Sequence, residues 1–255
     1  MKNSIIITLL SSLFLFASCK KKETTQDTAN NPTTTGGSTT GSTTGSTGGS
    51  DYYSTIKTNY IISNSAGFET KDSLAHAIFY SQPVSNPGYS LVSAGNVSLN
   101  SVNIPTIGGV GVSYFKQPIN VNLKNILVWS ISGSGTLTAF SHSLTPSFPN
   151  YTGGNLLQDS CSKSAGITIN VSGVTNNISN NVIVRLNAGS YSSIKYILSS
   201  NGSVTFSAQD LAAFPTNQSL TIQLSMANLT FATYGGKKHG FSNGLEYYKN
   251  SYLKP

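Results

Sequence analysis

The side chains that could carry out chemistry are few in this chain of 255 residues. Catalysis needs several titratable groups that converge on one point. After residue 50, the acids and histidines are Asp51, Glu69, Asp72, His76, His142, Asp159, Asp210, His239 and Glu246. Only Glu69 and Asp72 form a close pair of acids in sequence. We therefore predict no catalytic residues and a protein that is not an enzyme.

The sequence also lacks the local motifs that mark common active sites and metal sites. It has no Gly-x-Ser-x-Gly elbow, no His-Glu-x-x-His and no Cys-x-x-Cys, and calcium loops need several acids within about twelve residues. We predict no metal and no cofactor. A glycosidase needs two facing carboxylates. The six acids could supply such a pair, so a hydrolase remains the least favoured alternative.

Two stretches have a chemical interpretation beside a structural one. Cys161 would need a histidine nearby to act as a nucleophile, and His142 lies 19 positions upstream; a small buried side chain is the favoured interpretation. In "YGGKKHGFSNG" (234–244), backbone amides with Lys237, Lys238 and His239 could hold an anion. A hairpin turn between two strands explains the same letters and is favoured.

Tyrosines near the C-terminus are further candidates for ligand binding. Tyr247 and Tyr248 are adjacent, among 13 tyrosines in the chain. Flat rings give contact area at a low entropy cost, which is how many sugar-binding and protein-binding surfaces are built. Strand alternation, however, predicts that most of these rings are buried.

The basic charge does not indicate nucleic-acid binding. The formal net charge is +7, but Arg185 is the sole arginine and Lys237-Lys238 is the only adjacent basic pair beyond the first 22 residues. A nucleic-acid surface needs many clustered Arg and Lys side chains. We attribute the charge to scarce acids and predict no nucleic-acid partner.

The N-terminus predicts export and a lipid anchor. An apolar run of 12 residues, Ile5–Phe16, ends at Phe16-Ala17-Ser18-Cys19; this run is too short to span a bilayer but suits a signal peptide. The ending resembles the bacterial lipobox, which implies cleavage after Ser18 and acylation of Cys19. Acyl chains would bind the bilayer, with lysines 20–22 at the headgroups. The alternative is an ordinary secreted protein.

A polar linker follows, so we expect residues 1–18 to be a signal peptide and residues 19–50 a tether. Gly/Ser/Thr tracts cannot bury enough apolar area to become ordered, and a coil of this length spans roughly 30 Å. Asp27-Thr28-Ala29 and Asp72-Ser73-Leu74 resemble bacterial O-glycosylation acceptors at Thr28 and Ser73. Chance explains such short matches equally well.

Residues 51–255 alternate between apolar and polar with a period of two, which is typical of half-buried strands. The segments 119–123, 127–131, 167–171, 182–186 and 220–226 show this alternation, and turns recur about every ten residues. A change of phase near Ala227-Asn228 predicts a bulge. We expect an all-β, antiparallel, immunoglobulin-like sandwich, with a division into two packed subdomains near 150–165 left open.

Three local features complete the fold prediction. Ser207 and Asp210 form a capping-box-like start before Pro215, which predicts one short helix over 207–214. Residues 74–80 alternate as a strand rather than a helix. Trp129 in the middle of a strand predicts a core residue, with ligand stacking as the alternative.

Several stretches resemble a group of exported proteins and lipoproteins of Bacteroidota-type bacteria. The resemblance covers most of residues 90–255, through Trp129–Gly133, Phe148-Pro149, "KSAGITINVSGVTNN", "VTFSAQDLAAFP" and "YGGKKHGFSNGLEYYKN". It implies an all-β, immunoglobulin-like body and no particular activity. In such bacteria, lipoproteins exported to the cell surface usually carry a lysine or glutamine and then acidic residues directly after the lipidated cysteine. Lys20-Lys21-Lys22 stand here instead, so an outer-membrane lipoprotein could face either the periplasm or the exterior.

These patterns favour a membrane-anchored module that binds a glycan or an envelope protein without catalysis. Such a module predicts an exposed aromatic patch. A structural component of the envelope is the alternative, and it predicts long unprotected edge strands instead.

Overall fold

The computed structural model of the chain describes residues 51–65, 68–107, 112–154 and 157–255. These belong to one compact unit, Ser50–Pro255. The expected signal peptide (1–18), the lipidated Cys19, the linker (19–50) and Thr28 lie outside the described residues. Within the described ranges, no helix has the length and apolar character that crossing a bilayer requires.

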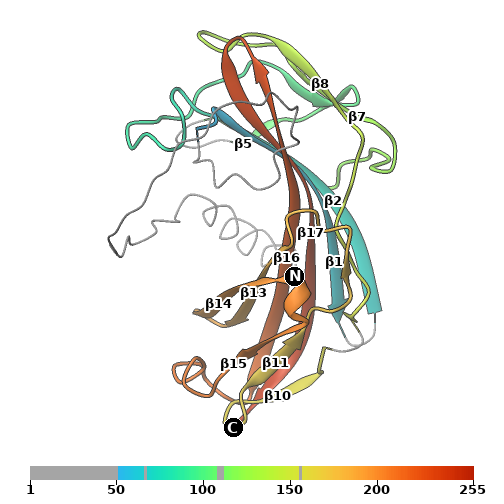
Figure 1. The fold of residues 1–255 in the computed structure, drawn as a ribbon, viewed down its shortest axis with the longest axis vertical. Helices are drawn as coiled ribbons and strands as arrows, with labels where there is room; N and C mark the ends of the chain where they lie inside the picture. Colours follow the sequence, from blue (N-terminus) through green and yellow to red (C-terminus); the bar gives the residue numbers. More distant parts are fainter. Residues whose placement is uncertain (1–50, 66–67, 108–111, 155–156) are drawn as a thin grey trace, which may run out of the picture. The chain divides into compact units, whose positions relative to one another are not determined.

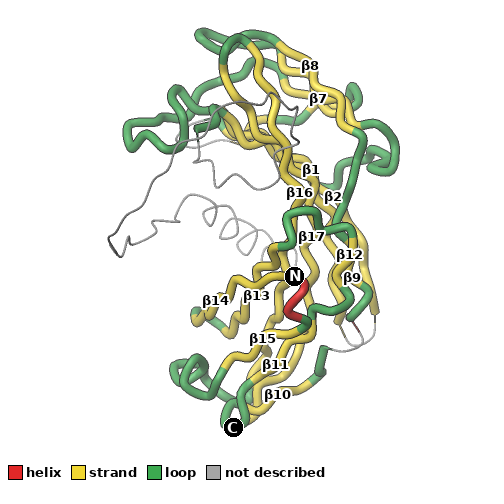
Figure 2. Tube along the Cα trace, viewed as in Figure 1, coloured by secondary structure: helices red, strands yellow, loops and turns green. Residues whose placement is uncertain are grey.

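The predicted all-β class is confirmed: the described residues form strands, together with the short 3-10 turn η3 Ser199–Asn201 (Figure 2). The strands are β1 Ser54–Ser65, β2 Phe68–Phe79, β3 Val97–Leu99, β4 Val102–Asn103, β5 Thr106–Ile107, β6 Ser113–Lys116, β7 Leu127–Ile131, β8 Phe140–Leu144, β9 Asn150–Tyr151, β10 Ser160–Ser162, β11 Ile167–Asn170, β12 Val174–Thr175, β13 Asn181–Ala188, β14 Tyr191–Leu198, β15 Ser203–Phe206, β16 Gln218–Tyr234 and β17 Lys237–Lys254.

One nine-stranded sheet organises the unit, in the order β14-β13-β16-β17-β1-β2-β6-β5, with β10 also paired to β17. The sheet is mixed rather than purely antiparallel as expected, because β1 and β10 both run parallel to β17. A four-stranded sheet (β4-β3-β7-β8) and two small pairs (β11–β15 and β12–β9) accompany it. Figure 1 shows β16 and β17 as one long hairpin, with β7 and β8 toward its tip and β11 and β15 toward its other end.

The hairpin of β16 and β17 closes through a two-residue turn, Gly235-Gly236, between paired Tyr234 and Lys237. Both glycines have positive φ, +55° and +74°, as the type I′ turn of a tight hairpin requires. The favoured interpretation of residues 234–244, a hairpin between two strands, is therefore confirmed.

Two hydrophobic clusters lie on the same face of the nine-stranded sheet. In β17, Phe241 belongs to one cluster and Leu245 and Tyr247 to the other, and residues an even number apart in a strand point to the same side. We call them the Trp129 cluster, covered by the β3–β7–β8 sheet, and the Phe206 cluster, covered by β11 and β15. The fold is thus consistent with a sandwich. Trp129 is buried in the core, as predicted.

A polar row separates the two clusters on this face. Asn228 in β16 pairs with Asn243 in β17, which pairs with Thr58 in β1, and all three are buried. The Asn228 amide donates to the carbonyls of Ser147 and Asn176 at 2.8 Å each and accepts from the Ile178 backbone N–H at 2.8 Å. Asn228 therefore ties two connecting segments to the sheet at the boundary between the clusters.

The predicted bulge near Ala227-Asn228 is wrong. β16 and β17 keep one register from Gln218↔Leu253 to Tyr234↔Lys237. The change of phase in the sequence arises because Leu229 and Phe231 place apolar side chains on the opposite, exposed face of an unbroken strand.

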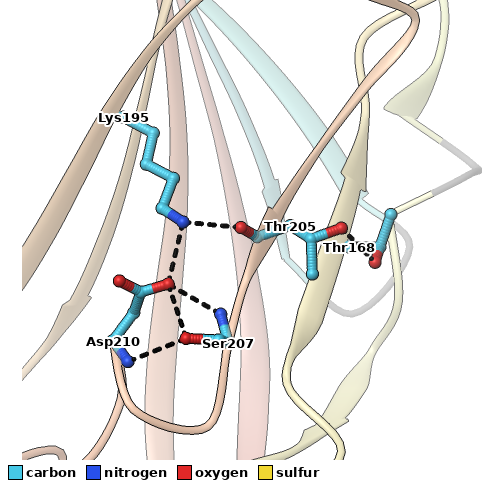
Figure 3. A network of polar contacts seen from close by, with 5 residues as sticks. All are labelled: Thr168, Lys195, Thr205, Ser207 and Asp210. Carbon is cyan, nitrogen blue, oxygen red and sulfur yellow. Dashed lines mark hydrogen bonds and ion pairs between the residues drawn. The ribbon is translucent and has the colours of Figure 1, made fainter.

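Two other local expectations differ from the structure. Residues 119–123 form no strand, although Ile119 and Leu123 are buried; the Ile119 N–H bonds the Ser73 carbonyl at 3.1 Å as part of a connection. Residues 208–213 form hydrogen-bonded turns instead of a helix. The capping-box bonds do form, since the Asp210 carboxylate accepts from the Ser207 N–H at 2.7 Å (Figure 3), but Pro215 leaves too little length for a helix to propagate.

The expected strand over residues 74–80 is largely confirmed by β2, which ends at Phe79. Ser73, one of the two suggested glycosylation acceptors, lies in β2 and pairs with Tyr60 of β1. Its hydroxyl donates to the Ile119 carbonyl at 3.1 Å.

Candidate functional site

The five residues singled out on β17 are divided between the two faces of the sheet. Strand alternation places Lys237, His239 and Tyr247 on the face that carries the hydrophobic clusters. Lys238 and Tyr248 point to the opposite face, which we call the outer face. The structure therefore does not bring the five side chains together.

His239 and Tyr247 have packing roles. Each is only 1% exposed. The His239 Nδ1 lies 2.9 Å from the Ser54 hydroxyl, and its ring lies 4.7 Å from Phe140. The Tyr247 ring lies 5.1 Å from Tyr151. Burial lowers the pKa of His239 to about 4, so the imidazole is neutral at neutral pH.

The two lysines of the hairpin have separate partners. Lys237 Nζ donates to the Thr136 carbonyl at 2.8 Å and lies 5.3 Å from the centre of the Tyr53 ring. Lys238 Nζ lies 4.2 Å from the centre of the Phe231 ring on the outer face. A cation over an aromatic face is attracted to its negative charge density. The ammonium groups therefore hold neighbouring elements rather than converging on one point.

Tyr248 belongs to a hydrogen-bonded network around Glu246 on the outer face. Its hydroxyl donates to Glu246 Oε2 at 2.6 Å, and Lys57 Nζ and Asn59 Nδ2 donate to Oε1 at 3.1 and 3.0 Å. Burial acts to raise the pKa of the Glu246 carboxyl, but the Lys57 charge and these hydrogen bonds outweigh burial and lower the pKa overall. Glu246 is thus held ionised, which suits a structural ion pair better than a proton donor.

The other carboxylates each have a partner of their own. Glu69 pairs with Lys71, Asp159 with Lys249 and Asp210 with Lys195. Asp72 accepts from the Gln117 amide and Asp51 from the Ser85 hydroxyl. Among the residues that the structure describes, no three His, Cys, Asp or Glu side chains gather as a metal site would require.

Cys161 and His142 also have different partners. Cys161 is buried in the Phe206 cluster, with its Sγ 3.4 Å from the Ser251 hydroxyl. His142 Nδ1 lies 2.7 Å from the Tyr234 hydroxyl, and its ring stacks on Phe241 of the Trp129 cluster at 3.8 Å. Burial raises the pKa of the Cys161 thiol, which disfavours the thiolate that a nucleophile needs.

A group of rings that the sequence did not single out lies beside the start of β1. We call Tyr52, Tyr80, Tyr89 and Phe231 the aromatic cluster. Tyr80 and Tyr89 meet edge to face at 5.2 Å, and Tyr52 lies 6.0 Å from Phe231. A side-chain hydrogen bond to Thr55 acts to lower the pKa of both Tyr52 and Tyr80, although burial outweighs it.

Backbone hydrogen bonds fix the positions of these rings. The Tyr53 N–H bonds the Lys238 carbonyl at 2.7 Å, and the Tyr80 N–H bonds the Tyr53 carbonyl at 2.8 Å. The Val84 N–H bonds the Tyr52 carbonyl at 3.1 Å. The segment before β1 is therefore held between the β17 end of the hairpin and the chain that leaves β2.

The aromatic cluster is partly open to solvent. Phe231 is 44% and Tyr89 38% exposed, and Leu229 beside Phe231 on the outer face is 51% exposed. Burial raises the pKa of Tyr52 and Tyr80, so their hydroxyls stay protonated at neutral pH. Partly exposed rings beside neutral hydroxyls offer apolar contact and hydrogen bonding without an acid or a nucleophile.

The sequence contains a signal for this cluster in the change of phase near Ala227-Asn228. Leu229 and Phe231 caused the change of phase that suggested a bulge, whereas two exposed apolar side chains on the outer face of β16 explain it. Tyr52, Tyr80 and Tyr89 come together only through the pairing of β1 with β2 and the connection that follows it.

Comparisons of the chain with protein-family models, with curated proteins and with solved structures give no match.

Proposed function

We propose that this protein is a lipid-anchored, non-catalytic binding module of the bacterial cell envelope. In this proposal Cys19 carries the acyl chains, residues 20–50 tether the body, and an immunoglobulin-like β-sandwich binds a glycan through the aromatic cluster. An envelope protein is the alternative ligand. The proposed location is the outer membrane, facing either the periplasm or the exterior, within the Bacteroidota-type lipoprotein group that the sequence resembles.

The single observation that carries the proposal is the aromatic cluster. Sugar rings present apolar C–H faces and hydroxyl edges, so they bind surfaces that combine exposed rings with hydrogen-bonding groups. Phe231 and Tyr89 supply exposed rings, and Tyr52, Tyr80 and Thr55 supply hydroxyls. The separate partners of the carboxylates support a binding role over a hydrolase, because a glycosidase needs two carboxylates that face one reacting bond.

Substitution of the exposed rings tests the binding site. We expect Phe231→Ser and Tyr89→Ser in residues 20–255 to weaken binding to a glycan array about tenfold or more, as loss of an aromatic anchor does. The matched control is Ile126→Ser, because Ile126 is 60% exposed in a connection outside the cluster. A pull-down from envelope extracts with the same variants tests the protein ligand. If neither glycan nor protein binding depends on these rings, the proposed site is wrong.

Mass spectrometry of the mature chain tests the anchor separately. We expect an N-terminal peptide that begins at Cys19 and carries a diacylglyceryl group. An unmodified thiol at position 19, or a different first residue, would remove the lipid anchor from the proposal and leave the binding site unaffected.

A further inference from the structure

β14 is an edge strand of the nine-stranded sheet. It pairs with β13 over eight positions, from Asn181↔Leu198 to Ala188↔Tyr191, and on its other side the described part of the chain places no strand. The opposite edge of the same sheet is β5, which has two residues. Long edges with free backbone N–H and C=O groups are templates for pairing with another strand.

The side chains of β14 add apolar surface to this edge. Tyr196 is 59% and Leu198 45% exposed, and Tyr191 is exposed as well. Ile194, which lies on the outer face with Tyr196 and Leu198, is partly buried. Natural edge strands are usually short, or protected by charges, Pro or bulges, and β14 has a single charged residue.

That residue, Lys195, is already engaged within the chain. Its Nζ donates to Asp210 Oδ2 at 2.8 Å and to the Thr205 carbonyl at 2.7 Å (Figure 3). It also lies 5.1 Å from the centre of the Phe206 ring. These contacts direct the ammonium group toward the Phe206 cluster and pair its charge, so Lys195 does not protect the edge of β14.

We propose that two copies of this chain pair through β14, antiparallel, so that the two large sheets become one. In one register of β14 against itself no like charges meet, and Tyr196 faces Ser192 on the outer face. With Ile194 opposite its own copy, Tyr191 faces Ile197. In the same register Lys195 faces Ser193, so no like charges meet. A shift that placed Lys195 opposite Lys195 would bring two ammonium groups together across the axis.

A second copy explains this edge better than an unrelated strand, because a two-fold interface requires the same surface to match itself. The register meets that requirement over residues 191–197. The pairing is independent of the aromatic cluster, since β14 and β1 are separated by β13, β16 and β17 in the sheet. A dimer would therefore present two binding sites.

Charge reversal at the centre of the proposed interface tests the pairing. Both hydrophobic clusters lie within the unit Ser50–Pro255, so residues 20–255 without the acyl chains suit analytical ultracentrifugation. We expect a concentration-dependent dimer. Ile194→Glu and Ile194→Lys should each raise its dissociation constant at least about tenfold, because like charges meet at the axis. An equimolar mixture of the two variants should restore the dimer.

The design contains its own controls. Ile194 lies opposite Arg185 on β13, so Ile194→Glu places a carboxylate and Ile194→Lys an ammonium group beside that charge. Circular dichroism of both variants checks that each keeps the fold. Ile126→Glu changes the same residue type on an exposed connection and should leave the dimer intact. On mild oxidation Ile194→Cys should form a disulfide-linked dimer and Ile126→Cys should not. A wild-type chain that stays monomeric, or a dimer that persists in Ile194→Glu, would overturn the proposal.

Discussion

At the scale of single residues, Asn228 shows how one amide can organise a large sheet. It is buried between the two hydrophobic clusters and uses both its donor and its acceptor on the backbone of two connecting segments. Buried polar groups are retained in a fold when their hydrogen bonds are satisfied. Asn228 therefore fixes the connections after β8 and β12 relative to β16.

We predict that Asn228→Ala lowers the free energy of unfolding by about 2–4 kcal/mol, because it leaves backbone groups of Ser147, Asn176 and Ile178 without their partner. Urea denaturation measures the change. Asn250→Ala serves as the control, since Asn250 is exposed on the same hairpin and should change stability by less than about 0.5 kcal/mol. Equal effects for the two variants would contradict the role given to Asn228.

Sequence reasoning could place some residues but not others. Trp129 was assigned to the core because it lies in a strand with apolar neighbours on alternate positions. Tyr247 and Tyr248 could not be separated in the same way, because both are aromatic and adjacent. Which of the two faces the core depends on which side of β17 is covered by other strands, and that information is not local.

At the scale of elements, the turn of the long hairpin depends on close packing as well as on backbone conformation. A Cβ on Gly235 would lie 2.5 Å from the Thr138 hydroxyl oxygen, whereas a Cβ on Gly236 would meet nothing within 4 Å. Both positions have positive φ. Alanine substitution at Gly236 therefore measures the cost of backbone strain alone, and substitution at Gly235 measures that strain together with a steric clash.

We predict that Gly236→Ala lowers the free energy of unfolding by about 1 kcal/mol, from its left-handed backbone alone. Gly235→Ala should cost about 2–3 kcal/mol, because the clash with Thr138 adds to the same strain. Thermal or urea unfolding measures both. Thr138→Ala in the Gly235→Ala chain should recover part of the loss, and similar costs at the two glycines would show that Thr138 does not restrict the turn.

Most elements were predictable where strands alternate, as in β7, β11, β13 and β16. Residues 119–123 alternate too, but they form a connection. Ile119 and Leu123 alternate because both side chains are buried in the core, and the segment pairs with no strand. Ser207 and Asp210 form the expected capping-box bonds, but these bonds close a turn rather than start a helix. The parallel pairing of β1 with β17 joins residues about 185 positions apart, so no local pattern could indicate it.

At the scale of the whole molecule, the buried histidines make stability depend on pH. Burial lowers the pKa of His239 to about 4 and that of His76 to about 3 from an ordinary value of 6.5, and it lowers the pKa of the partly buried His142 as well. The unfolded chain therefore takes up these protons first as the pH falls. The stability that depends on the neutral rings is complete above pH 6.5 and is lost progressively toward about pH 3.

We predict that the urea midpoint falls as the pH decreases from 6.5 to about 4, and that His239→Asn makes this dependence shallower. The asparagine lacks the titrating ring, so one fewer proton is taken up on unfolding in this range. The comparison is between the slopes of the two chains, because the substitution also removes packing against Phe140. An unchanged slope in His239→Asn would exclude His239 as a source of the pH dependence.

The parallel pairing of β1 with β17 has a consequence for how the body is made. β17 is the last strand in the described sequence, and it lies between the first strand and β16 at the centre of the large sheet. A nascent body that lacks residues 240–249 leaves β1 without one of its two neighbours. Loops closed over such a separation form slowly. The body should therefore remain unfolded until residues 240–249 have been synthesised, because only then can β1 pair on both sides.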